Sequence, residues 1–443
     1  MKRKLFFFTM GSLLFGFTLF IPYWTGVEAE KQFRLLNQHY PTHDARMVLQ
    51  DMTYQRGWLI SQAQSTFELE RGVIAAESQR FTLQHRIEHG FLPIYPTIIY
   101  TTIAPQSEII NHLGLTESPV LVKTALQLDG SGNSELRTSP LALNAPNKPA
   151  KLTLQSITGS VAFTPNFAQL TGELQLPQVQ LETEQGKVQF HNTKFTTNLR
   201  SHADDLWLGL SEWQMAEVDL ISRTLPTVAL RQLKISVDNQ LVDKNLQVNL
   251  KSQLQQLTVK QDNYGPGDVA VEIRHLNVDS VNNVRQILHT MSNLSGAQTN
   301  ILLWAKLSQY GMTLLNEQPE LAIPQLNFAT PQGQVAGNLS LGVDKIEATA
   351  WLYPLTLLES FHGKLALQLP KSLLNQILAT AMQPTAADSQ TADETEVVQT
   401  LVANWLKRGW LTQQDQTYHI QAQLQGGMLD LNGRQILLKN LLR

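Results

Sequence analysis

Most of the chain alternates apolar and polar residues with a period of two, the pattern of half-buried β-strands. Between residues 81 and 88, Phe81, Leu83 and Ile87 alternate with polar neighbours, and residues 246–251 and 339–343 repeat the pattern. One apolar and one polar face per strand predicts antiparallel sheets rather than a parallel sheet covered on both faces. Turn signals separate such strands, at Asp129-Gly130-Ser131-Gly132 and at Asn432-Gly433.

The apolar positions change phase at Pro177. Leu174 and Leu176 precede this proline, whereas Val179 and Leu181 follow it. We expect a β-bulge or a sheet edge at this point, since proline cannot donate a ladder hydrogen bond.

A helical period of 3.6 residues interrupts the strands in a few places. It predicts a helix capped by Asp279 and further helices over Ile301–Leu315, Lys371–Met382 and the residues around Val398–Trp405. Residues 384–396 are too polar to bury a face and predict a flexible loop. Residues 26–41 predict an amphipathic stalk helix, with an ordinary helix docked on the folded body as the alternative.

The N-terminus carries three cations followed by an apolar run from Leu5 to Tyr23. A helix of this length rises about 28 Å, close to the hydrocarbon thickness of a bilayer. The run predicts a transmembrane anchor. The alternative is a signal peptide cleaved after Ala29, although signal peptides have shorter apolar runs. The proposed anchor residues are Leu5, Phe7, Leu13, Phe17, Ile21 and Trp24.

The expected fold class is therefore α+β and mostly antiparallel β: a transmembrane helix followed by an extended, curved β-sheet body with a few packed helices. Basic residues before the anchor predict a single-pass protein of the bacterial inner membrane, with the body in the periplasm. The expected parts are a cytoplasmic tip and anchor (1–25), the stalk (26–41), a β-rich part (42–278) and an α+β part (279–443).

Composition excludes several functions. The formal net charge is only −3, and no cluster of Lys and Arg follows the first four residues, so we expect no nucleic-acid partner. The sequence has no Cys, which excludes disulfides, thiol nucleophiles and Cys-based metal sites.

One short motif resembles a zinc site. His85-Arg86-Ile87-Glu88-His89 matches H-x-x-E-H, which places two histidines on one turn of a helix. Here the period of two predicts a strand, on which positions 85 and 89 lie about 13 Å apart, too far to share one ion. No nucleophile or phosphate-binding motif is present. We expect no metal, no cofactor and no catalytic residues.

Two segments stand out: residues 54–61, beginning Tyr-Gln-Arg-Gly-Trp, and residues 88–93, with His-Gly before a proline. Both resemble segments of the YdgA-like family of bacterial envelope proteins, which has no assigned reaction. The Trp24-Thr25-Gly26 exit and the closing hairpin at 427–433 are also similar. A structural role at a strand junction is favoured over a ligand site for these motif residues. They are Tyr54, Arg56, Gly57, Trp58, His89, Gly90 and Pro93.

Three functions remain open. The first is a non-enzymatic, membrane-anchored scaffold or binding module of the envelope, whose partners are the inner membrane and another envelope protein. The second is a protein that binds or transfers lipid or another hydrophobic ligand, by analogy with AsmA-like proteins. The third, a hydrolase or metalloenzyme, requires a polar cleft with converging ionisable groups.

Overall fold

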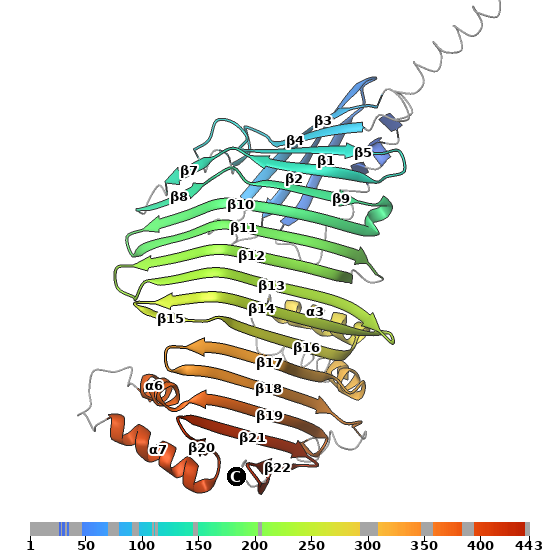
Figure 1. Cartoon of the computed structure of the whole chain (residues 1–443). Helices are drawn as coiled ribbons and strands as arrows, with labels where there is room; N and C mark the ends of the chain where they lie inside the picture. The colour runs from blue at the N-terminus through green and yellow to red at the C-terminus, as the bar shows by residue number, and fades with distance from the viewer. Residues whose placement is uncertain are drawn as a thin grey trace, which may run out of the picture. The chain divides into compact units, whose positions relative to one another are not determined.

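The structure is a computed structural model of the 443-residue chain. It describes residues 26–27, 29–31, 33–34, 47–69, 79–90, 97–108, 110, 114–144, 149–202, 206–292, 309–346, 358–382 and 394–438. The chain forms two compact units (Figure 1). The first comprises Met1–Trp207 and Val218–Thr224, and the second comprises Leu208–Glu217 and Leu225–Arg443. The boundary expected at residue 279 stays a prediction.

The first unit is an antiparallel sheet in the order β1–β2–β3–β4–β5–β6–β9–β10–β11. A side branch, β7–β8, pairs with the second half of β10. The elements are β1 (Met47–Gln55), β2 (Ile60–Leu69), β3 (Gln79–Glu88), β4 (Thr97–Ile103), β5 (Val120–Leu126), β6 (Gly132–Thr138), β7 (Leu141–Asn144), β8 (Ala150–Leu154), β9 (Thr158–Phe163), the 3₁₀ turn η1 (Pro165–Phe167), β10 (Gln169–Thr183) and β11 (Gly186–Ser201). Strand β12 (Trp207–Ser222) contributes residues to both units.

Two irregularities shape this sheet. In β1, Gln50 is an extra residue, because Leu49 pairs with Phe67 and Asp51 with the adjacent Thr66. In β10, Pro177 lies where the neighbouring strand changes from β9 to β8, so no ladder hydrogen bond is lost there.

The helical residues near the N-terminus pack on the first sheet. Ala29 and Phe33 are buried in a core with Ala63, Ile87, Ile99, Leu126 and Phe163, which come from β2, β3, β4, β5 and β9. Within the described part of the segment, the apolar side of the predicted stalk therefore faces the sheet. Residues 35–41 of that prediction lie outside the described residues.

The second unit contains an antiparallel sheet in the order β13–β14–β16–β17–β18–β19–β21–β22–β23. Short strands β15 and β20 pair with β14 and β21. The strands are β13 (Val228–Val242), β14 (Asn245–Val259), β15 (Asp262–Tyr264), β16 (Gly267–Asn277), β17 (Glu320–Thr330), β18 (Gly333–Val343), β19 (Phe361–Pro370), β20 (Thr412–Gln414), β21 (Thr417–Gln425), β22 (Met428–Leu431) and β23 (Arg434–Leu437).

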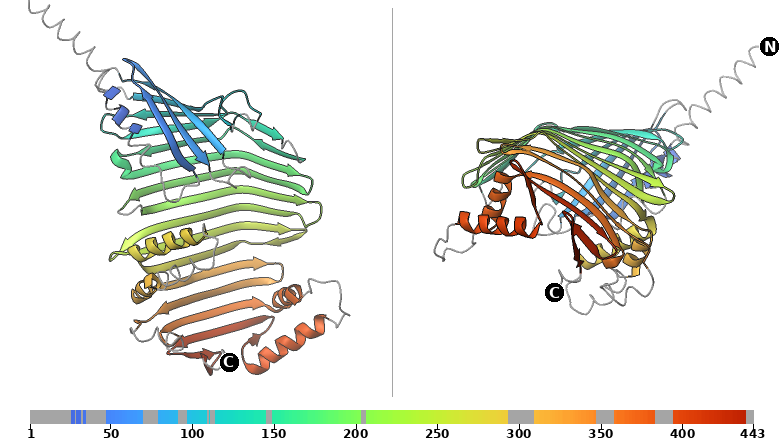
Figure 2. Two further views of the ribbon diagram at one scale, coloured as in Figure 1. Left: turned by 180° about the vertical axis from the view of Figure 1, so that it is seen from behind. Right: turned by 60° about the horizontal axis from the view of Figure 1, so that its bottom comes forward.

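Helices α6 (Lys371–Met382) and α7 (Glu394–Arg408) cover one end of this sheet (Figure 2). Val398 and Val402 of α7 are buried against Leu369 and Tyr418, with Leu367, Leu374 and Ile420 beside them. The bounds of α6 agree with the sequence prediction. Helix α3 (Val278–Ser292) is capped by the side chain of Asn277, which accepts a hydrogen bond from the Ser280 amide, and not by Asp279.

The apolar face of the second sheet crosses seven strands. One cross-strand row runs Ile235, Ser252, Val269, Leu326, Gly337, Leu367, Ile420 without a break. The next row toward the other end of the strands runs Leu233, Leu254, Gly267, Phe328, Val335. We call this surface the apolar face and the opposite surface of the same sheet the polar face.

A strand can keep one apolar face although the alternation of apolar and polar residues shifts by one position along it. In β13 the apolar positions pass from Val228 and Leu230 to Leu233 and Ile235, on either side of Gln232. Gln232 has a left-handed backbone with φ 50°, and in β11 Asn192, opposite Pro177, has φ 49°. A left-handed residue turns the following side chains over, which compensates the change of phase. Pro177 thus marks a local irregularity of this kind.

The transmembrane helix expected at the N-terminus requires correction. Within the described ranges, no helix is long and apolar enough to cross a membrane. Helices α3 and α7 have 15 residues each. A helix of 15 residues rises only about 22 Å, which is shorter than the hydrocarbon core of a bilayer, about 30 Å. The transmembrane helix of the expected fold class and the inner-membrane location that relied on it are not supported, whereas the mostly antiparallel β-sheet of that fold class is confirmed. The anchor residues Leu5, Phe7, Leu13, Phe17, Ile21 and Trp24 lie outside the described residues.

Candidate functional site

The motif residues 54–61 form a tight turn between β1 and β2. Gly57 is required at its position, because a Cβ atom there would lie 2.0 Å from the carbonyl oxygen of Ile60. The turn projects three consecutive apolar side chains into solvent: Trp58, Leu59 and Ile60 are 54%, 51% and 43% exposed. We call residues 57–60 the Gly57 turn.

A chain of hydrogen bonds closes the Gly57 turn. The amide of Gly57 donates to Ser61 Oγ at 3.2 Å, and Ser61 Oγ lies 2.8 Å from His89 Nε2. His89 Nδ1 lies 2.9 Å from the carbonyl oxygen of Trp58. Since a carbonyl only accepts, Nδ1 carries the proton and Nε2 accepts from the Ser61 hydroxyl. The His89 amide donates to the carbonyl of Leu59 at 2.8 Å.

The sequence motif thus brings Gly57, Trp58 and His89 together, and Gly90 beside them is buried. Ser61, which completes the chain, belongs to the motif segment but was not singled out from the sequence. Its role depends on a partner 28 residues away, His89, and no local pattern indicates that the two residues meet. Pro93 lies outside the described residues.

Arg56 joins the sheet to the helical residues. Its guanidinium forms a two-point hydrogen-bonded ion pair with the Glu30 carboxylate, which also accepts from Arg34 at 2.8 Å. Burial would raise the pKa of Glu30, but the hydrogen bonds from Arg56 and Arg34 outweigh it and lower the pKa overall. Glu30 was not identified from the sequence, where it reads as one more polar residue of an amphipathic helix.

Two further groups of this region are perturbed by burial. Burial raises the pKa of the Tyr54 hydroxyl, although nearby Ser61 opposes the change. The hydroxyl has no hydrogen-bond partner of good geometry within the described chain. Burial lowers the pKa of His85 to about 4. The edge of the Phe33 ring contacts His85, with ring centroids 4.8 Å apart.

The H-x-x-E-H motif lies on a strand, β3, as its alternation predicts. His85 contacts Thr101 Oγ1 at 2.9 Å and Ser65 Oγ at 3.2 Å, whereas His89 contacts Ser61. Each imidazole therefore has hydroxyl partners of its own. Within the described ranges, no group of three His, Asp or Glu residues is arranged to hold a metal ion.

The Ser61–His89 pair does not resemble a working nucleophile. Ser61 is 0% exposed, so no substrate reaches its hydroxyl, and a backbone carbonyl occupies the place of the acid that orients the histidine in a triad. The pair instead fixes the Gly57 turn.

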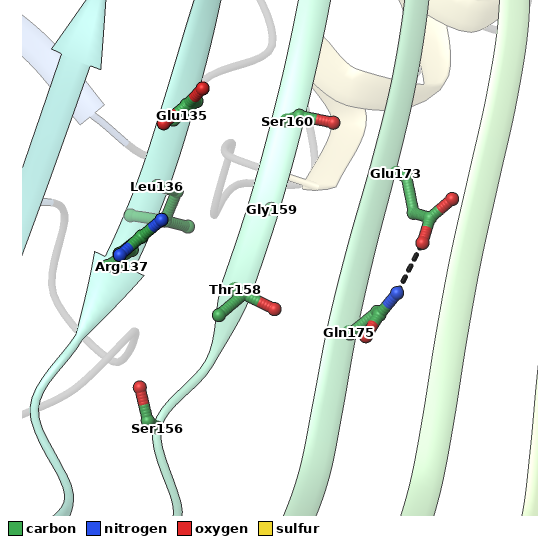
Figure 3. A pocket seen from close by; sticks show the side chains of 9 residues that line it. All are labelled: Glu135, Leu136, Arg137, Ser156, Thr158, Gly159, Ser160, Glu173 and Gln175. Atoms are coloured by element: carbon green, nitrogen blue, oxygen red, sulfur yellow. Dashed lines mark hydrogen bonds between the residues drawn. The ribbon is translucent and has the colours of Figure 1, made fainter.

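A shallow cavity of about 410 Å³ lies on the sheet of the first unit (Figure 3). Strand β9 contributes short side chains, Thr158 and Ser160, while longer side chains of β6 and β10 stand on either side. Glu135 and Glu173 both pair with Ser160 from opposite sides. Their backbones are thus two strand spacings, about 9.6 Å, apart.

Within that cavity Glu173 is already engaged. It accepts a hydrogen bond from Gln175 and forms an ion pair with Lys194 at 3.1 Å. These two contacts, the Gln175 bond first, lower the pKa of Glu173. The cavity therefore provides polar contacts, and one of its two carboxylates already has two partners.

The comparison with family models gives one match. A model described as "Bacterial protein of unknown function (DUF945)" matches residues 1–439. The chain belongs to this family. The match covers residues of both units. The finer YdgA-like relationship is not confirmed by it. A search of the curated proteins and a search of the solved structures returned no match.

Proposed function

We propose that this DUF945 protein is a non-enzymatic binding module that holds a hydrophobic ligand, such as a lipid acyl chain, on the apolar face of its second unit. The observation that supports this proposal is the row of cross-strand partners from Ile235 to Ile420, which crosses seven strands without a break. Ser252 is its one polar side chain. Removing an apolar surface of this composition from water lowers the free energy.

The described residues at both ends of this row are half-buried. Leu367 and Ile420 pack against the core that contains Val398 and Val402 of α7, yet they stay half-buried, as do Ile235 and Val269 at the other end. Trp213 of β12 adds an indole that is 47% exposed. Its neighbour Glu212 is ion-paired to Lys234 on the polar face at 2.6 Å, so Trp213 points to the apolar face.

A scaffold for a protein partner is the competing role, and lipid content separates the two. Under the ligand hypothesis, protein isolated by gentle extraction carries lipid that mass spectrometry detects. Protein that is repeatedly free of lipid would contradict the proposal.

A variant pair locates the binding face. Titration with cis-parinaric acid should show saturable fluorescence, and Trp213→Gln should weaken binding by about tenfold, since one buried aromatic contact contributes about 1.4 kcal/mol. Leu210→Gln is the matched control, because Leu210 is 43% exposed and shares the polar side of β12 with Glu212. Equal losses in both variants would rule out the apolar face.

The YdgA-like relationship is part of the same proposal. Its support is the motif geometry: Ser61 joins Gly57 and His89 in one turn, and Arg56 beside that turn pairs with Glu30.

A further inference from the structure

The polar face of the second sheet contains an amide-lined cavity of about 400 Å³, within the size range of small-molecule sites. Its floor is formed by Ala336 and Ala366, whose methyl side chains leave room between longer neighbours. The hydrogen-bonding groups around the floor come from four strands: Gln325, Asn327, Asn338, Gln368, His419 and Gln421.

The register explains why these groups converge. Asn327, Ala336, Gln368 and His419 are direct cross-strand partners in one row across β17, β18, β19 and β21. The adjacent row contains Asn338, Ala366 and Gln421. Each row therefore places an alanine between amide-bearing side chains.

One wall of the cavity is preorganised. Asp268 of β16 accepts hydrogen bonds from the side-chain amides of both Gln325 and Asn327, the latter at 3.4 Å. A carboxylate accepts only, so it holds the two NH₂ groups and leaves the amide oxygens as the acceptors available to a ligand. On the other walls, the side-chain amides of Asn338, Gln368 and Gln421 have no hydrogen-bond partner within the described ranges, and each offers a donor and an acceptor.

The lining selects by charge. The residues that line the cavity include no Lys, Arg, Asp or Glu, so an anionic ligand finds no cation, and the Asp268 carboxylate, which holds Gln325 and Asn327, is not part of the lining. A large apolar ligand would strand the amide groups without partners. A hydroxyl group, which both donates and accepts, matches these side chains, and the C–H face of a sugar ring fits against the alanine methyl groups.

We propose that the amide-lined cavity binds a neutral oligosaccharide. The site lies on the polar face, opposite the surface assigned to a hydrophobic ligand, and does not depend on that assignment. Because neutral hydrogen bonds exposed to water each contribute little, the expected dissociation constant is about 1 mM.

Saturation-transfer NMR of the full chain with maltotetraose, cellotetraose and chitotetraose tests this. At least one tetraose should receive saturation, and Ala366→Leu and Ala336→Leu, which fill the floor, should each reduce the signal by about tenfold or more. Ala229→Leu makes the same change on the polar face of β13, outside the cavity, and should leave the signal intact. Both cavity variants should keep the far-UV circular dichroism and the cooperative urea unfolding of the parent protein, which shows that they are folded.

No transfer to any of the three sugars, or an unchanged signal in both cavity variants, would overturn the proposal. If the parent protein does not bind cis-parinaric acid but does bind a tetraose, only the hydrophobic-ligand function is overturned.

Discussion

Ser61 and His89 lie 28 residues apart in the chain, yet the Ser61 hydroxyl contacts His89 Nε2 at 2.8 Å. Ser65, four residues after Ser61, and His85, four residues before His89, form an equivalent contact at 3.2 Å. Ser61 serves two partners, because its oxygen also accepts from the Gly57 amide. Buried polar groups of this kind are costly when a partner is removed.

The first prediction compares the two serines. Ser61→Ala should reduce the free energy of unfolding by about 2 kcal/mol, since it removes the hydroxyl that contacts His89 Nε2 and accepts from the Gly57 amide. Ser65→Ala removes the contact with His85, which keeps Thr101 as a partner, so the loss should be smaller. Urea unfolding measures both. A larger effect at Ser65 would mean that the Ser61 chain does not hold the turn.

The second prediction concerns Gly57. Gly57→Ala should destabilise the protein by more than about 2 kcal/mol, because the added methyl group collides with the Ile60 carbonyl. The control is Gly311→Ala, a helical position with nothing within 4 Å of the new atom. That change should stabilise by about 0.5–1 kcal/mol through helix propensity. Similar effects of the two changes would argue against the geometry of the turn.

The third prediction addresses the Glu30–Arg56 ion pair. The two side chains are 17% and 36% exposed, so the coupling energy from a double-mutant cycle with Glu30→Gln and Arg56→Gln should be only about 0.5–1 kcal/mol. It should fall as salt is added, because exposed charges are screened. A coupling that is independent of salt would show that packing, and not charge, joins the helical residues to β1.

The fourth prediction is a pH dependence from His85. Its pKa falls from the ordinary 6.5 to about 4 on folding, so between these values the unfolded chain binds a proton that the folded chain does not. Stability should therefore decrease as the pH is lowered through this window, by about 3 kcal/mol at most, and His85 should add no further loss below it.

The variant His85→Gln tests this assignment. Urea unfolding at about pH 7.5 and about pH 4.5 should show a smaller stability difference in the variant than in the parent, because the titrating group is gone. An identical difference in both proteins would place the pH dependence elsewhere.

Local patterns predicted the elements that depend on neighbouring residues. The alternation gave the antiparallel strands, Lys371–Met382 is a helix, and Asn432-Gly433 connects β22 to β23 with φ values of 51° and 82°. Each of these depends on side-chain period or backbone freedom within a few residues.

The cap of α3 was predicted two residues too late. Asn277 caps the helix rather than Asp279, and sequence propensity cannot separate the two, since both side chains accept hydrogen bonds.

Other features were missed because they depend on residues far apart in the chain. Ser61 and Glu30 acquire their roles only when β2, β3 and the helical residues come together. The membrane-spanning helix came from apolar length alone and is not supported by the described helices. The amide-lined cavity needs the register of four strands, which single-strand patterns do not provide.

The extra residue Gln50 has a consequence for self-association. In the described chain β1 pairs only with β2, so its other edge offers backbone groups to any extended peptide. The bulge interrupts the regular spacing of these groups, and the adjacent Asp51 would bring a charge into any strand-to-strand joint. Deleting Gln50 would remove the bulge and make this edge of β1 regular. We expect the shortened protein to polymerise through this edge and the parent protein not to do so.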